Sequence, residues 1–348
     1  MTSIDIAGTH FLINGKIANE GRTLDSIPLD GLLLNSRMIN GAFDDANPDT
    51  VHMWAYPDTG TWDPERNNRE YLAAMAQWKE DGLDAFTIGI QGGSPQGYSE
   101  EQPWDNAGFT PDGGFKEDYR RRIGNIVEEA ERLGLIVILD IFYHGQDHRL
   151  RDEQAIKRAI TEVCTWVLDS GWRHVLIEIA NEVNWHKHYT HEIIKAPRVH
   201  ELIAHAKSVT GEDGRRLLVS TSFLAHLPYV TPEVLAEADF VLIHGNGTPE
   251  PDTLRQMVEE VKATQNWTPK PIVFNEDDHF DFDQPRNHMK AALEAGASWG
   301  YFDPGSVTTN PPQPTIGDYL NGYQAVPINW AVSTDTKKGF FDTLRRVR

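Results

Sequence analysis

The chain has 348 residues, which is enough for one large barrel or two ordinary domains, and its 39% hydrophobic content allows a sizeable core. Its 32 basic and 52 acidic residues give a formal net charge of −20. This charge argues against a surface for nucleic acid or anionic membrane and favours solubility.

The first residues, MTSIDIAGTHFLINGK, contain no basic leader followed by an apolar run, and no segment approaches the length of a membrane span. We therefore expect a cytoplasmic protein with no membrane association, although a secreted one remains open if a leader has been removed. The single cysteine, Cys164, lies among apolar neighbours in TEVCTWVL, so we expect a buried thiol and no internal disulfide.

In chain order, the first expected element is an N-terminal hairpin at about residues 8–25, with the Asn-Gly turn of FLINGK. Short apolar runs follow at regular intervals and are predicted strands: residues 30–36, 84–91, 135–143, 174–181, 216–222, 239–245, 270–276 and 297–303.

Segments with helical periodicity lie between these runs. One face of the segment around residues 119–133 is apolar, as is one face of residues 156–167, and glycines end several of these segments. Apolar strands that alternate with helices indicate a parallel sheet covered by helices. Eight such repeats favour an α/β fold of the (β/α)8 TIM-barrel type, over an open doubly wound sheet. We expect one domain over residues 1–348, with long loops after the first two strands.

Two of the predicted strands end in glutamate. HVLIEIAN is followed by Glu182, and KPIVFNE ends at Glu276. Barrel enzymes build their active sites at the carboxyl ends of the strands, so these carboxylates should face each other across the barrel mouth. One protonated and one ionised carboxyl group is the arrangement that cleavage of a glycosidic bond requires.

These motifs resemble those of the clan A glycoside hydrolases of the cellulase and mannanase type (family 5-type). Their hallmark is Asn-Glu at the end of the fourth strand and a second Glu at the end of the seventh, matched here by IEIANE and KPIVFNE. The resemblance implies that Glu182 is the acid/base, that Glu276 is the nucleophile and that Asn181 holds the sugar 2-hydroxyl. It also implies substrate-binding roles for further residues at matching positions: Arg37, His144, His244 and Trp299.

The sequence departs from this family after the sixth strand. Where the family commonly has a Tyr two residues beyond the histidine, this chain reads His-Gly-Asn. Either Asn246, Tyr301 or Tyr143 is expected to contact the nucleophile, or the subsite differs, and we interpret the chain as a member of a divergent family with an unusual substrate. We also expect Trp185, beside the acid/base, to pack on a sugar ring, and Gln91 in QGGSPQG to contact a hydroxyl. The aromatic residues of the long loops are further candidates for sugar packing: Trp54, Tyr56, Trp62 and Trp104.

Alternatives remain at several positions. Asp277 and Asp278 adjoin the expected nucleophile and compete with it for that role, or belong to a loop or a sugar contact. Glu178, within a strand, is expected to be structural. The histidine-rich HGQDH and HKHYTH suggest a metal-dependent hydrolase, but the first strand lacks the His-x-His of zinc barrels, so we expect no metal and no cofactor.

The function predicted from the sequence is thus a retaining glycoside hydrolase whose partner is a carbohydrate. In this mechanism the pKa of Glu182 should be raised, Glu276 should be ionised, and the two carboxyl groups should lie about 5 to 5.5 Å apart. A carbohydrate-binding barrel without catalysis and a metal-dependent barrel hydrolase are the alternatives. The sequence leaves open the sugar, the linkage, endo or exo action, transglycosylation and the oligomeric state.

Overall fold

A computed structural model describes residues 1–99, 101–225, 230–305 and 322–348. Its main sheet has the strand order β10-β9-β8-β7-β6-β14-β13-β12-β11, and every neighbouring pair is parallel. β10 and β11 are two halves of one strand, because only residue 221 separates them, so the sheet closes on itself. The prediction of a (β/α)8 barrel is confirmed, and each predicted run overlaps a barrel strand. The bounds are β6 (Leu34–Arg37), β7 (Ala85–Gly89), β8 (Ile136–Phe142), β9 (Val175–Ala180), β10 (Leu218–Ser220), β11 (Ser222–Phe223), β12 (Val241–His244), β13 (Ile272–Asp277) and β14 (Ser298–Tyr301).

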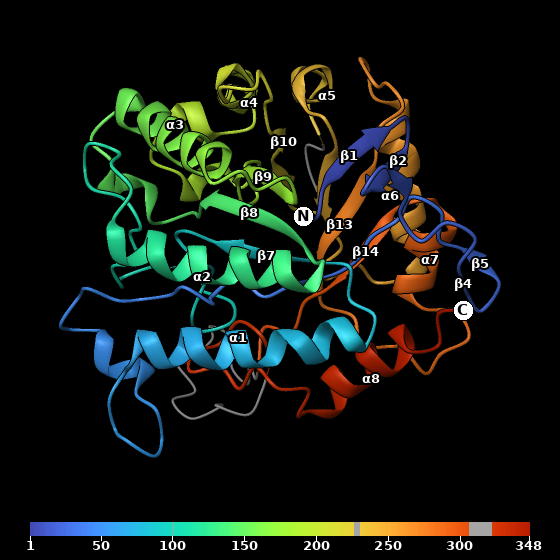
Figure 1. Ribbon diagram of the computed structural model, residues 1–348, viewed down its shortest axis with the longest axis horizontal. Helices are drawn as coiled ribbons and strands as arrows, with labels where there is room; N and C mark the ends of the chain where they lie inside the picture. The colour runs from blue at the N-terminus through green and yellow to red at the C-terminus, as the bar shows by residue number, and fades with distance from the viewer. Residues whose placement is uncertain (100, 226–229, 306–321) are drawn as a thin grey trace.

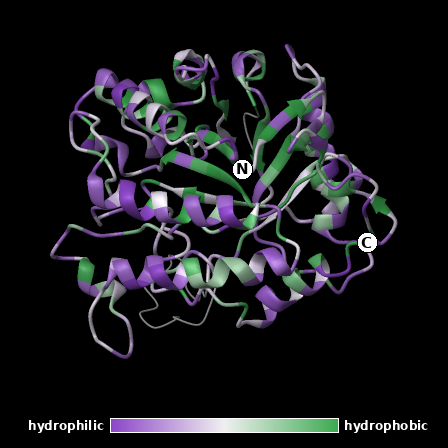
Figure 2. Ribbon diagram, in the orientation of Figure 1, coloured by the Kyte–Doolittle hydropathy of each residue, from purple (hydrophilic) through white to green (hydrophobic). Residues whose placement is uncertain are grey.

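Helices pack around the outside of the barrel (Figure 1). The apolar faces predicted around residues 119–133 and 156–167 are the buried faces of two of them, and Gly134 ends the first in a left-handed conformation. Figure 2 shows the contrast between hydrophobic strands and the hydrophilic residues on the helices. The α-helices are α1 (Pro64–Glu80), α2 (Glu117–Leu133), α3 (Glu153–Asp169), α4 (Val199–Ser208), α5 (Pro232–Glu237), α6 (Pro251–Ala263), α7 (His288–Glu294) and α8 (Asp335–Leu344). Short 3-10 helices occupy Val51–Trp54, Asp147–Arg149, His186–His188 and Glu192–Ile194.

An N-terminal antiparallel sheet lies against the amino-terminal end of the barrel strands. It consists of β1 (Ile4–Ala7), β2 (His10–Ile13) and β3 (Lys16–Ile17), and a separate hairpin follows with β4 (Thr23–Leu24) and β5 (Ile27–Pro28). Asn14 and Gly15, both with positive φ, form the turn between β2 and β3. Phe11 of β2 is fully buried and packs on Phe240 among the inward-facing apolar residues of the strands. The amino-terminal half of the barrel is therefore filled with apolar side chains, and the polar interior lies at the other end.

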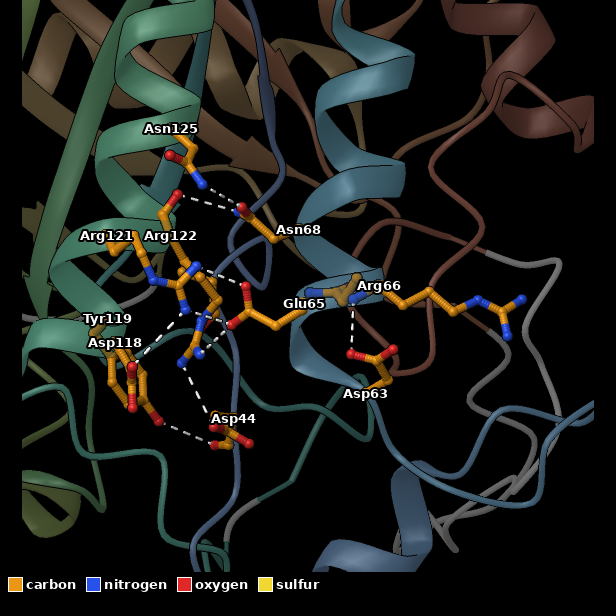
Figure 3. Close-up of polar contacts among 12 residues, drawn as sticks. Asp44, Asp63, Glu65, Arg66, Asn68, Asp118, Tyr119, Arg121, Arg122 and Asn125 are labelled. Carbon is orange, nitrogen blue, oxygen red and sulfur yellow. Dashed lines mark hydrogen bonds and ion pairs between the residues drawn. The ribbon is translucent and has the colours of Figure 1, made fainter.

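The packing of α1 against α2 includes an ion-pair network, which Figure 3 shows. Glu65 from α1 accepts hydrogen bonds from Arg121 and Arg122 of α2, at 2.7 Å and 3.2 Å. Arg122 is almost fully buried, and its guanidinium also donates to the carbonyl of Ala42, in the loop after β6. The hydrogen bonds from Arg121 lower the pKa of Glu65 to about 2, against the effect of burial. Glu65 thus joins two helices to a loop at the carboxyl end of the barrel.

We expect Glu65→Gln to lower the melting temperature by roughly 1 to 2 °C near neutral pH, since it leaves the buried Arg122 with a weaker partner. A carboxyl group with a lowered pKa stabilises the fold above its ordinary pKa of 4.5, and this contribution is lost as the pH falls towards about 2. The difference in melting temperature between the wild type and the variant should therefore shrink below pH 4.5. Glu128→Gln, at an exposed position of α2, is the matched control. A difference that stays constant down to pH 2 would contradict this account.

Candidate active site

A pocket of about 390 Å³ opens at the carboxyl end of the barrel strands. Such a volume lies within the range of small-molecule sites in proteins. The described residues that line it come from the end of β13 and from the loops after seven of the strands: Tyr98, Ser99, Tyr143, His144, Glu182, Trp185, Leu224, Asn246, Gly247, Glu276, Asp278 and Gln324. Both glutamates singled out in the sequence are among them.

A larger hollow of about 650 Å³ lies at the amino-terminal end of the strands, between the β4–β5 hairpin and the loop before β14. Its acidic residues are Asp25, Asp30 and Glu294, of which Asp25 pairs with Lys290 and Arg346 and Glu294 with Arg255. Since Asp25 and Glu294 are engaged in surface ion pairs, this hollow is less suited to catalysis than the smaller pocket.

Glu182 stands at a sharp turn directly after β9. Its φ of 51° is in the left-handed region, which is unusual for a non-glycine residue and costs conformational energy. Ser222 of β11 holds this turn, because its Oγ accepts from the N–H of Glu182 at 3.0 Å and its carbonyl accepts from the N–H of Val183. The turn brings the Glu182 carboxylate to the His244 ring, where Oε1 lies 2.8 Å from Nδ1.

Glu276 is brought to the pocket by an irregularity in β13. The register between β13 and its neighbours shifts at this point, so that His244 pairs with Glu276 although Ile243 pairs with Phe274. A bulge of this kind re-aims a side chain that simple alternation would direct elsewhere. The Glu276 carboxylate lies 2.7 Å from Nε of Arg37 and accepts a hydrogen bond of 2.5 Å from Nδ2 of Asn246.

The two carboxylates are close neighbours. Glu182, His244 and Glu276 each offer an atom that lies within 4.8 Å of the other two, and all three residues are buried. His244 stands between them, at 2.8 Å from the Glu182 carboxylate and 3.5 Å from that of Glu276. In an inverting glycosidase the two carboxyl groups lie about 6.5 to 9.5 Å apart, which leaves room for the attacking water. The separation of the two carboxylates here is too short for that arrangement.

The electrostatics of this group differ from the expectation for Glu182. Burial favours its neutral form, but the hydrogen bond and charge of His244 outweigh burial and lower the pKa of Glu182. Burial alone would lower the pKa of His244, but the charges of Glu276 and Glu182 and the hydrogen bond to Glu182 outweigh burial and raise it. The direction predicted for the pKa of Glu182 is therefore wrong for the free protein, because the neighbouring His244 favours the ionised carboxylate.

Burial raises the pKa of Glu276, against the opposing effects of Arg37 and His244. The contacts with Arg37 and Asn246 oppose the effect of burial, because both favour the ionised form of Glu276. One carboxylate oxygen faces the Arg37 guanidinium and the other faces the amide N–H of Asn246, and neither group can accept a hydrogen bond. Arg37 is 1% exposed, so its charge acts on Glu276 with little screening by water.

Further sequence-predicted residues lie in the pocket wall. His144 is 4% exposed, and burial lowers its pKa to about 4, so it is neutral at physiological pH. The Trp185 ring is nearly parallel to the His144 ring at 5.9 Å. Asn246 contacts Glu276 at the position where the resemblance implied a Tyr, and Tyr143 lines the same pocket.

Other predicted residues are placed elsewhere. Trp299 and Tyr301 are fully buried on the outer face of β14, where they pack on Phe340 of α8. The substrate-binding role expected for Trp299 and the contact with the nucleophile offered for Tyr301 are therefore wrong. Gln91 is buried behind the wall, and its side-chain oxygen accepts from the N–H of Tyr143. Asn181 is 1% exposed and does not line the pocket, and its expected contact with a 2-hydroxyl stays a prediction.

The aromatic residues of the long loops also serve the fold. Trp54, Tyr56 and Trp104 are buried, and Trp54 makes edge-on contacts with Trp104 and Phe43. Of the described aromatic residues in these loops only Tyr98, which no motif marked, lines the pocket, and it donates a 2.7 Å hydrogen bond to Asp278.

Asp277 and Asp278 turn in opposite directions. Asp277 is fully buried away from the pocket and accepts hydrogen bonds from Trp299 and His279, which leaves it unsuited to act as the nucleophile. Asp278 lines the pocket wall. Glu178 is buried inside the barrel and accepts a hydrogen bond from Asn275, in keeping with the structural role expected for it.

Two groups of described residues could offer three ligands to a metal ion: Glu182 with His244 and Glu276, and residues 277–279. In the first group Glu276 is already paired with a guanidinium at 2.7 Å, whose charge would repel a bound cation. In the second the ring nitrogens of His279 contact Asp277 and the carbonyl of Thr248. Neither HGQDH nor HKHYTH supplies such a group among the described side chains. The donor sets therefore fit hydrogen bonding better than metal binding.

Similar three-dimensional structures are known. A family 5 mannosidase from Rhizomucor miehei superposes over 99% of this chain and 97% of its own, with a TM-score of 0.53 and 14% identity. The fold is that of the family 5 glycoside hydrolases. A β-glucosidase from Thermotoga maritima matches 91% of this chain and 98% of its own, at a TM-score of 0.54 and 11% identity. A broad-specificity endoglucanase from Clostridium longisporum matches 90% of this chain and 95% of its own, at a TM-score of 0.55 and 12% identity.

At these identities the likeness to family 5 enzymes extends to the fold and no further. No protein-family model matches the sequence, and no curated protein matches it. The similar structures include a mannosidase, a β-glucosidase and an endoglucanase, so the shared barrel does not select a substrate. No described helix combines the length and apolarity that crossing a membrane requires.

Proposed function

We propose that the protein is a retaining glycoside hydrolase with Glu276 as nucleophile and Glu182 as acid/base. The observation that carries the proposal is the short separation of two buried carboxylates, within 4.8 Å, at the carboxyl end of a (β/α)8 barrel. The fold of family 5 glycoside hydrolases supports it.

In the first step a Glu276 oxygen attacks the anomeric carbon and the bond to the leaving oxygen breaks. Glu182 protonates that oxygen, and a glycosyl ester of Glu276 forms. In the second step Glu182 removes a proton from water, which attacks the anomeric carbon, and the Glu276 carboxylate leaves. The hemiacetal product keeps the configuration of the substrate.

His244 supplies an explanation for how Glu182 becomes the acid although its pKa is lowered in the free protein. In the doubly protonated form of His244, which its raised pKa favours, the Nδ1 proton lies on the 2.8 Å contact to Oε1 of Glu182. Transfer of this proton leaves a neutral His244 that keeps its Nε2 proton, and it converts the Glu182 carboxylate into the carboxylic acid. A bound sugar displaces water from the pocket and increases the cost of charge there, which favours the neutral pair.

The pocket wall offers both kinds of surface that a sugar needs. Trp185 and Tyr98 present flat rings for the C–H faces of a pyranose, and Asn246, Asp278 and Gln324 present polar groups for its hydroxyls. The buried amide oxygen of Asn246 has no partner in the described part of the chain and can accept from a sugar hydroxyl.

The stereochemistry of the first product tests this proposal. We expect one or more members of a panel of 4-nitrophenyl glycosides and natural oligosaccharides, with both anomeric configurations represented, to be hydrolysed. Proton NMR at early times should show the anomer of the same configuration as the substrate before mutarotation. Appearance of the opposite anomer first would refute the retaining mechanism. Oligosaccharide binding without hydrolysis over days would identify a carbohydrate-binding barrel, and activity lost on chelation would identify a metal-dependent hydrolase.

A further inference from the structure

Two short segments next to the proposed nucleophile run side by side and are joined residue by residue. They are residues 245–248, which follow β12, and residues 276–279, which begin in β13. The N–H of Gly245 donates to the carbonyl of Glu276 at 2.8 Å, and the Asn246 amide donates to the Glu276 carboxylate. The succession of contacts makes these segments one unit, which we call the paired loop.

The contacts continue beyond the carboxylate. The N–H of Gly247 donates to Oδ1 of Asp278 at 3.0 Å, and the carbonyl of Thr248 lies 2.8 Å from Nε2 of His279. Thr248 also folds back on its own segment, since its Oγ1 donates to the carbonyl of Gly245 at 2.8 Å. The position of Asn246 thus depends on contacts on both sides of it.

His279 closes the far end of the paired loop. Because a carbonyl oxygen can only accept, Nε2 of His279 must carry a proton and donate it to Thr248. Nδ1 contacts the carboxylate of Asp277, whose other oxygen accepts from Nε1 of Trp299 at 2.6 Å. The ring also stacks on His288 at 3.4 Å between centroids, and His288 in turn contacts Asp281. The His279 ring is therefore fixed on both edges and on one face.

Close packing adds to this constraint. A Cβ atom at Gly245 would lie 2.8 Å from Cγ of Asp277, which is too close for a carbon atom. The two segments can therefore approach this closely only because residue 245 is a glycine. The Asn246 side chain is short and reaches Glu276 only because the backbone of residues 245–248 is held against β13. A Tyr at residue 246 has a longer side chain and could reach the Glu276 carboxylate without the backbone being held so close to β13.

We propose that His279 is a positioning residue for Glu276, acting through Thr248 and Asn246. The inference rests on the proposed function of Glu276 as nucleophile. His279 does not line the pocket among the described residues, and its effect is to keep the donor of Asn246 on the nucleophile. In this chain Asn246, held in position by His279 through Thr248, donates the hydrogen bond to the nucleophile for which the resemblance implied a Tyr.

The two nitrogens of His279 can be tested separately. Gln places an amide N–H near the position of Nε2, whereas Asn places one near that of Nδ1. We expect H279Q to keep the Thr248 contact and retain activity within about threefold of the wild type. H279N and H279A should lose the Thr248 contact and reduce kcat by about tenfold. This reduction is smaller than the loss of a whole hydrogen bond to a charged group can cause, because Asn246 remains present. Equal activities of H279Q and H279A would overturn the role of the Thr248 contact.

A double-mutant cycle separates positioning from a general structural role. N246A should reduce kcat by about ten- to a hundredfold, since it removes a hydrogen bond to a charged group. If His279 acts through Asn246, the double variant N246A/H279A should be no slower than N246A within about twofold. A double variant whose loss equals the product of the two single losses would overturn the proposal. Thermal unfolding of each variant shows whether the fold persists.

A second readout needs no turnover, so it tests this inference even if the proposed function fails. In protein labelled with ¹³C at the glutamate carboxyl carbons, the Glu276 signal is assigned by its absence from E276Q and titrated by NMR. Loss of a donor to the carboxylate raises the pKa of that carboxyl group. N246A and the double variant should therefore show the same upward shift of the Glu276 pKa, H279A should show an upward shift no larger than theirs, and H279Q should show none. An H279A titration identical to that of the wild type would overturn the proposal.

Discussion

Replacing Glu276 by Gln is expected to reduce kcat by roughly 10⁴- to 10⁶-fold, the scale on which removal of a covalent nucleophile acts in a hydrolase. Gln has the shape of Glu but cannot form a glycosyl ester, because its amide is not a nucleophile at the anomeric carbon. The fold should persist, since the amide oxygen can still accept from Arg37 and the surrounding paired loop keeps its backbone contacts. The measurement is the rate of release of 4-nitrophenol from a reactive glycoside, with circular dichroism to check the fold.

Glu260→Gln, on the exposed face of α6, is the matched control for the loss of one carboxylate and should leave kcat unchanged. Glu276→Ala adds a second check, because it leaves space for an added anion. Azide should then attack from the side that Glu276 occupied and give a glycosyl azide of inverted configuration, which NMR identifies. Substantial hydrolysis by E276Q, or an azide product of retained configuration from E276A, would show that another group is the nucleophile.

The barrel was predictable from the sequence because its signal is repeated. Eight apolar runs separated by helical periodicity specify strands buried on both faces, and each run overlaps a strand of the structure. The split of the fifth strand into β10 and β11 gave no such signal. It arises where the strand must pair with β9 on one side and with β12 on the other to close the sheet.

The two glutamates of the proposed catalytic pair could be singled out for the same reason, since both follow or end apolar runs. Its geometry was not. Alternation along β13 places Val273 and Asn275 on the inner face, and only the bulge turns Glu276 inward as well, so that periodicity alone could not choose between Glu276 and Asp277. Likewise the left-handed φ of Glu182 is set by Ser222, which is 40 residues away in sequence.

The predictions that failed concern side chains whose direction depends on packing. Trp299 lies in the expected eighth strand, where the resemblance implied an aromatic residue at the substrate, but its side chain is on the outer face of β14 and packs on Phe340 of α8. Tyr98 and Asp278 form a hydrogen bond although they are 180 residues apart in the sequence. No local sequence pattern predicts such a contact. The pKa of Glu182 was misjudged because burial was considered without the neighbouring His244.

The role of Glu182 leads to a second large effect, which depends on the leaving group. In Glu182→Ala the first step loses its acid, so kcat/KM for an unactivated oligosaccharide should fall by about 10²- to 10⁴-fold. A 2,4-dinitrophenyl glycoside has a leaving group that needs no proton, so kcat/KM for it should remain close to the wild-type value. Its kcat should still fall, because the second step has lost the base that activates water, and the glycosyl ester on Glu276 should accumulate and be visible by mass spectrometry.

Azide distinguishes this role from mere disturbance of the site. The anion needs no base and can enter the space that the E182A substitution leaves beside His244, so it should restore kcat with the dinitrophenyl glycoside and give a glycosyl azide of retained configuration. The opposite configurations expected from E182A and E276A follow from the positions of the two carboxylates on either side of the bound sugar. If E182A loses kcat/KM equally for both substrates and azide has no effect, Glu182 is not the acid/base. His244, whose Nδ1 proton faces that carboxylate at 2.8 Å, would then be the group to test as the acid.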